Sequence, residues 1–199
     1  MVLSIVVLVF FAAVFALTTL APTAARADEM FSWRGGLGFG KRDRGPNSTR
    51  NEFITALSLT GDMLWGPPRH GAFRFGPAME GRIVDFASLE GAGGFTLLTP
   101  LPFDMALTTT GLIGLAMRRD APDGWMGIGT ATLGYRSYNY HGWYGYGLNA
   151  FFSFRKQING DVHLIEYTGG VEVDMLFILV VPFLAIKNWL NKGDPHEDE

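Results

Sequence analysis

The chain contains no cysteine, and only 18% of its 199 residues are charged. Without cysteine there is no disulfide framework, no thiol nucleophile and no cysteine-ligated metal site. Soluble domains usually carry about 25% charged residues, so this chain has little charge for a fully hydrated surface. Without Arg26 in the leading segment, 15 basic residues stand against 19 acidic ones, a balance that argues against nucleic-acid binding.

A long apolar run is confined to the beginning of the chain. Residues 2–20 are almost wholly apolar, and Ala25-Arg26-Ala27 forms a small-x-small cleavage pattern before Asp28. We therefore predict that residues 1–27 are a secretory signal peptide, with an uncleaved anchor helix as the alternative. Beyond this segment no run follows a 3.6-residue period, and Pro182 interrupts the one later apolar stretch, residues 175–190.

The clearest pattern is a strict alternation over residues 103–117. Phe103, Leu107 and Ile113 belong to an apolar face, and the intervening positions are mostly small or polar. Alternation of this kind predicts a β-strand with two different faces. The run is longer than a common strand of about 5–6 residues, and it exceeds the roughly 9–11 residues with which a tilted strand crosses a bilayer.

The same pattern recurs along the chain, with stretches of turn-forming residues between the runs. Asn159-Gly160, for example, is a strong tight-hairpin signal. The predicted strands are residues 33–41, 53–65, 73–83, 89–97, 103–117, 125–138, 143–155 and 162–177. We predict an all-β fold, an eight-stranded antiparallel up-and-down transmembrane β-barrel over residues 31–177. Residues 178–199 are predicted to form a short C-terminal helix and an acidic tail.

Charge indicates which face of the strands points inward. One phase is almost free of charge, whereas the other collects the charged residues. A soluble barrel with its apolar phase around a ligand is the alternative, but its outer face would need more Lys and Glu. An eight-stranded barrel is just wide enough for side chains to fill, so charges inside it are expected to pair. We predict that paired charges plug the lumen, and a narrow pore is the alternative. The predicted lumen charge network consists of Arg74, Glu80, Arg82, Glu90, Asp104, Glu166 and Glu172.

As an architecture, residues 33–177 resemble the small eight-stranded outer-membrane barrels of Gram-negative bacteria. Residues 168–175, with a polar residue, glycines and then alternating hydrophobes, also look like the barrel-assembly signal of a last strand. The resemblance implies an integral outer-membrane location and folding by the barrel-assembly machinery. It also implies that the first strand begins, and the last strand ends, on the periplasmic side. A basic outer rim that would attract lipopolysaccharide then consists of Lys41, Arg42, Arg44, Arg118, Arg119, Arg155 and Lys156.

Catalytic patterns are weak. The four histidines stand in no spacing that suggests a nucleophile, a base and a carboxylate, and His163 is the one candidate for a test. We predict no metal and no cofactor, and the glycines of residues 35–40 are expected to make room inside the barrel. The predicted function is a structural, lipid-contacting or narrow-pore, porin-like role. A lipid A-modifying acyltransferase or deacylase and a soluble periplasmic barrel that binds an apolar ligand are the alternatives.

Overall fold

The computed structural model describes residues 29–44, 52–67, 72–103, 105–119, 123–135, 147–158 and 164–174. Among these residues there is no helix long and apolar enough to cross a membrane. The predicted signal peptide, the predicted C-terminal helix and the acidic tail lie outside the described residues.

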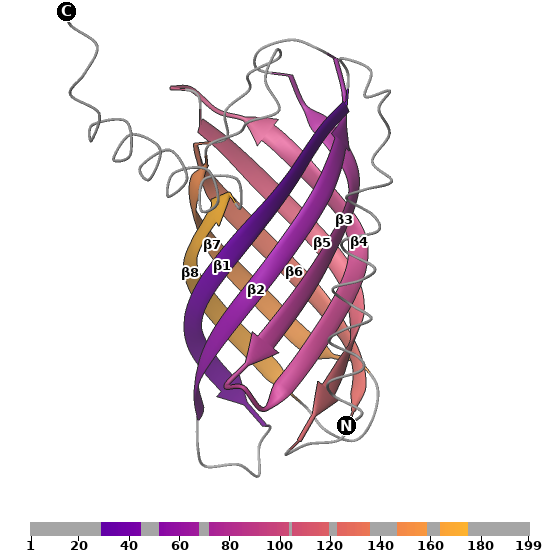
Figure 1. The fold of residues 1–199 in the computed structure, drawn as a ribbon, viewed down its shortest axis with the longest axis vertical. Coiled ribbons are helices and arrows are strands. Elements are labelled where there is room, and N and C mark those ends of the chain that lie inside the picture. Colours follow the sequence, from indigo (N-terminus) through magenta and orange to yellow (C-terminus); the bar gives the residue numbers. More distant parts are fainter. Residues whose placement is uncertain are drawn as a thin grey trace, which may run out of the picture.

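The chain forms a closed barrel of eight antiparallel strands, each paired with its neighbours in sequence order (Figure 1). The strands are β1 (Glu29–Asp43), β2 (Glu52–Trp65), β3 (Arg74–Val84), β4 (Ser88–Pro100), β5 (Met105–Arg118), β6 (Gly124–Tyr135), β7 (Leu148–Gln157) and β8 (Ile165–Asp174).

The barrel is closed by pairing of β1 with β8, from Arg34 opposite Asp174 to Asp43 opposite Ile165. We call the end where β1, β3, β5 and β7 finish the lower mouth, and the end where β2, β4, β6 and β8 finish the upper mouth, as they lie in Figure 1. The all-β class, the eight strands and the up-and-down order are therefore confirmed.

Some predicted strand ends differ from the observed ones. Phe103 was expected to begin a strand, but it lies in the turn before β5 with a positive φ of 64°. β7 begins at Leu148, and residues 143–146 of its predicted range lie outside the described residues. At the lower mouth β1, β5 and β7 each continue for one or two residues beyond the predicted end.

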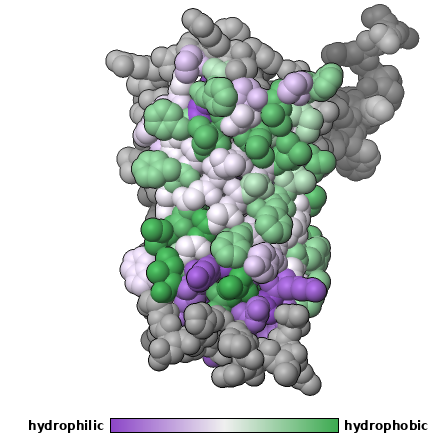
Figure 2. Space-filling view, turned by 180° about the vertical axis from the view of Figure 1, so that it is seen from behind, coloured by the Kyte–Doolittle hydropathy of each residue, from purple (hydrophilic) through white to green (hydrophobic). Residues whose placement is uncertain are grey.

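The two phases of the strands face opposite sides of the wall. Hydrophobic side chains such as Phe53, Phe95 and Ile113 are exposed on the outside, at 70%, 68% and 60%. Figure 2 shows hydrophobic side chains over the wall, with hydrophilic ones gathered towards the lower end. The inside is mostly polar, with small apolar clusters near each mouth, such as Leu64, Leu98 and Ala106 at the upper one.

Candidate functional site: a charge network in the barrel lumen

Glu166 of β8 is the centre of a group of charges in the lower half of the lumen. Its carboxylate accepts hydrogen bonds from Nε of Arg42 and from a terminal nitrogen of Arg82, each at 2.8 Å. The Glu166 side chain is fully buried, and that of Arg82 is 2% exposed. These residues belong to β8, β1 and β3, so the ion pairs join strands that are far apart in the sequence.

Glu90 and Arg155 extend this group across the lumen. Glu90 of β4 accepts from Arg82 at 3.1 Å and from Arg155 of β7 at 2.9 Å. Arg155 also donates to Glu80 of β3. Arg118 of β5 lies 3.8 Å from the other Glu90 oxygen, which has no hydrogen-bond partner among the described residues. We call these seven residues the lower network: Arg42, Glu80, Arg82, Glu90, Arg118, Arg155 and Glu166.

A second group lies towards the upper mouth. Arg34 of β1 bridges Asp62 of β2 at 2.9 Å and Glu172 of β8 at 3.0 Å, and all three side chains are buried. Ser32 donates a hydrogen bond to Asp62 at 2.9 Å. We call Arg34, Asp62 and Glu172 the upper network. It joins β8, β1 and β2, so it also spans the seam at which the barrel closes.

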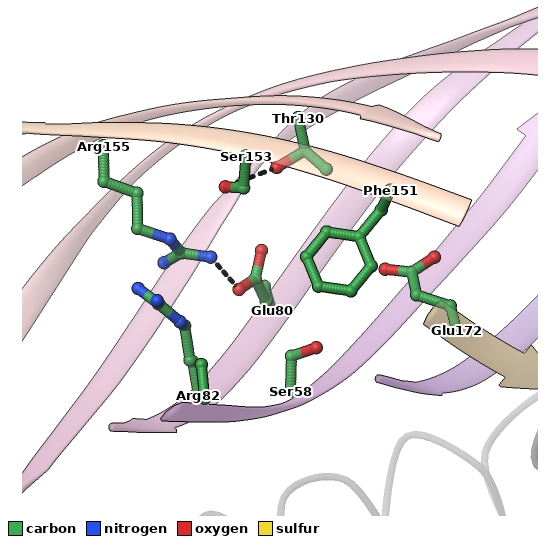
Figure 3. Close-up of a pocket in the computed structure, with 9 residues that line it drawn as sticks. Ser58, Glu80, Arg82, Thr130, Phe151, Ser153, Arg155 and Glu172 are labelled. Atoms are coloured by element: carbon green, nitrogen blue, oxygen red, sulfur yellow. Dashed lines mark hydrogen bonds and ion pairs between the residues drawn. The ribbon is translucent and has the colours of Figure 1, made fainter. Parts of the chain in front are cut away.

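Hydroxyl groups and one aromatic ring fill the space between the networks. Phe151 of β7 projects into the lumen, and its ring lies between Glu80 and Glu172 (Figure 3). A side chain at Gly38 would come within 2.8 Å of this ring, so the glycines of β1 make room for it, as predicted. The cavity beside the ring measures about 10 Å³, room for roughly one water molecule.

The buried charges of the described lumen balance. Six arginines face the interior, and they are matched by six carboxylates: Arg34, Arg42, Arg74, Arg82, Arg118 and Arg155 against Asp62, Glu80, Glu90, Glu166, Glu172 and Asp174. Unpaired charges inside such a narrow barrel would each cost several kcal/mol, so pairing is what allows so many to be buried. Chemically, the arrangement cross-links the walls of the barrel.

Of the predicted lumen residues, the structure brings Glu80, Arg82, Glu90 and Glu166 together in the lower network. Glu172 belongs instead to the upper network. Arg74 is buried at the upper mouth, where it donates to the carbonyl of Pro67 at 3.3 Å. Asp104 lies outside the described residues.

The predicted rim residues divide into two groups. Lys41, Arg119 and Lys156 are exposed at the lower mouth, and Arg44 pairs with Glu52 at 3.0 Å. Arg42, Arg118 and Arg155 were expected at this rim, but their side chains lie inside the barrel. The reason is that β1, β5 and β7 continue past their predicted ends, so positions assigned to the rim still alternate into the lumen.

The predicted lumen charge network does not contain Arg34, although the charged phase of residues 33–41 includes it, and it does not contain Asp62. A count of phase along residues 53–65 would have placed Asp62 inside as well. All four histidines, His163 among them, lie outside the described residues. No cluster of metal-binding side chains occurs in the described part of the chain.

No model of a known protein family matches this chain, and a search of curated proteins found no match to it. Fold and lumen alone therefore define the class: a closed eight-stranded antiparallel barrel with a charged, filled interior and an apolar outer wall.

Proposed function

We propose that this protein is an integral outer-membrane β-barrel with a structural, lipid-contacting role and a closed lumen. The observation that carries the proposal is the division of its two surfaces. Six arginines and six carboxylates are inside, whereas the large side chains exposed on the wall are hydrophobic. In water the opposite arrangement would be favoured, because apolar surface is costly to hydrate and buried charge is costly to desolvate.

The dimensions of the apolar wall support a membrane location. On β5 the outward positions run from Met105 to Met117 without a charged residue. At a rise of about 3.3 Å per residue this stretch is ~40 Å long, and a tilt of about 45° reduces its height to ~28 Å. The apolar band of outer-membrane barrels is about 25 Å tall and the hydrocarbon core is about 30 Å thick.

Aromatic pairs near both mouths also support it. Towards the upper mouth, Trp65 and Phe75 contact each other edge to face at 6.2 Å between ring centroids. Towards the lower mouth, Phe39 and Phe53 are stacked at 6.2 Å. Aromatic residues favour the two membrane–water interfaces, where they form girdles around membrane barrels.

The direct test is the electrophoretic mobility of the protein in the outer-membrane fraction, with and without boiling. We expect a compact band that shifts on heating, because the paired ladders of a closed barrel resist detergent until heat opens them. Recovery of the protein in the soluble periplasmic fraction would contradict the proposal.

The closed lumen leads to a second prediction. Purified protein added to a planar bilayer is expected to produce no defined current steps, because ion pairs and Phe151 occupy the described interior and the cavity beside the ring measures about 10 Å³. Detergent buffer without protein is the control for leakage. Reproducible unitary steps from the folded, heat-shifting protein would instead support the narrow-pore alternative.

The remaining alternatives have less support. A barrel that binds an apolar ligand needs its apolar phase inside, whereas this one has it outside. For the lipid A-modifying enzyme, the described residues provide no support beyond the sequence-based argument. Contact with lipopolysaccharide stays a prediction that depends on Lys41, Arg119 and Lys156, with Asp43, Asp85 and Asp123 exposed at the same mouth. Assembly by the barrel-assembly machinery is likewise a proposal.

A further inference from the structure

The turn between β3 and β4 holds a phenylalanine in an unfavourable backbone conformation. Ala87 donates its N–H to the carbonyl of Val84 at 2.9 Å, so Asp85 and Phe86 are the two central residues of a tight hairpin. Both have a positive φ, 50° and 55°. Such turns favour glycine at the second position, because a bulky side chain is strained there. Phe86 is nevertheless 82% exposed, at the lower mouth.

The next hairpin repeats this arrangement at the other end of the barrel. Phe103, in the turn between β4 and β5, has a φ of 64° and is 85% exposed. Leu101 donates to the carbonyl of Met105 at 2.8 Å, which closes the turn around it. Phe86 and Phe103 are therefore the two most exposed of the large exposed hydrophobic side chains in the described chain, and both are strained.

Residues in strained backbone conformations persist where other contacts compensate for the strain. Asp85 has such a contact within the fold, because its carboxylate accepts the N–H of Thr55 at 2.8 Å. For the Phe86 and Phe103 rings the described structure shows no such contact. We propose that Phe86 and Phe103 are a two-sided membrane anchor, each ring inserted into one interfacial layer of the bilayer. This inference rests on the proposed membrane location.

The spacing of the two rings fits this occupant. They are joined by β4 and its two turns, a separation of about 17 residues, or ~56 Å along the chain. With a tilt of about 45° this becomes roughly 40 Å along the membrane normal, close to the ~40–45 Å of a bilayer with its headgroup regions. Rings at these two heights would fix the depth at which the barrel sits in the bilayer.

The test compares the native chain with a Phe86→Asn/Phe103→Asn variant in phosphatidylcholine vesicles of matched thickness and in thin, short-chain vesicles. Asparagine tolerates positive φ, so the exchange removes the rings and most of the strain. In matched vesicles we expect the folding equilibrium constant of the variant to fall roughly tenfold or more, because two aromatic contacts are lost. In thin vesicles the two turns stand in water, so the relief of backbone strain dominates. We therefore expect the folding equilibrium constant of the variant to be about fivefold or more above that of the native chain.

The reversal of sign separates an anchor from a structural role. Phe95→Ala, at a 68% exposed position of the wall, is the control and should lower the constant in both kinds of vesicle. The same difference between native and variant in both vesicle types would overturn the anchor and leave the membrane proposal intact. A native chain that inserts into neither vesicle would overturn both.

Discussion

Glu166→Gln is expected to lower the free energy of unfolding by about 3–5 kcal/mol, the usual cost of removing one partner of a buried ion pair. Glu166 is fully buried, and both of its oxygens are used, one by Arg42 and one by Arg82, at 2.8 Å each. Glutamine has the same shape but no charge, so Arg42 loses its 2.8 Å carboxylate partner and Arg82 keeps Glu90, at 3.1 Å, as its counter-charge. The measurement is reversible urea unfolding of the purified barrel in lipid vesicles.

Glu52→Gln is the matched control for this experiment. Glu52 pairs with Arg44 at 3.0 Å and lies 3.9 Å from Arg42, but its side chain is 40% exposed at the lower mouth. Exposed pairs contribute about 0–1 kcal/mol, so the same substitution should have a small effect there. Equal effects at the two positions would mean that the lumen is hydrated and that the lower network does not hold the walls together. If the Glu166 variant does not fold, Glu90→Gln provides the same comparison within the network.

Much of the fold could be predicted because a barrel wall imposes a period of two along the chain. Each outward residue must suit one environment and each inward residue another, so alternation of apolar and polar residues predicted all eight strands and their inner face. Strand ends were less predictable. Phe103 continues the apolar phase of β5 in sequence, yet it lies in a turn at a φ of 64°, a conformation that alternation does not report.

The charged site was predictable as a face but not as a set of pairs. Phase alone places Glu80, Arg82 and Glu90 inside, and the structure brings them together. Which arginine meets which carboxylate depends on the relative shift of the strands, which sequence alternation does not contain. Arg155 shows this: its partners Glu80 and Glu90 are on β3 and β4, far from β7 in sequence.

A second large effect is expected at the seam between β1 and β8. Inside the barrel, a methyl group at Gly40 would overlap the carbonyl oxygen of Tyr167 and come within 2.8 Å of the Thr168 Cα. At Gly170 it would overlap the carbonyl oxygen of Leu37. These contacts are with backbone of the facing strand, so a side-chain rotation cannot relieve them. We expect Gly40→Ala and Gly170→Ala each to lower the free energy of unfolding by about 3 kcal/mol or more.

Gly111→Ala is the control, because Gly111 faces outward on β5 and a methyl group there meets no heavy atom within 4 Å. Glycine inside a strand is less favourable than alanine by about 0.5–1 kcal/mol, so this variant should be as stable as the native barrel or more so. Heat-shifted mobility and urea unfolding measure all three variants. A Gly40→Ala protein that closes and unfolds like the native chain would show that β1 and β8 can move apart at the seam. The distance between these strands would then be set by the Arg34 and Arg42 ion pairs that also cross it.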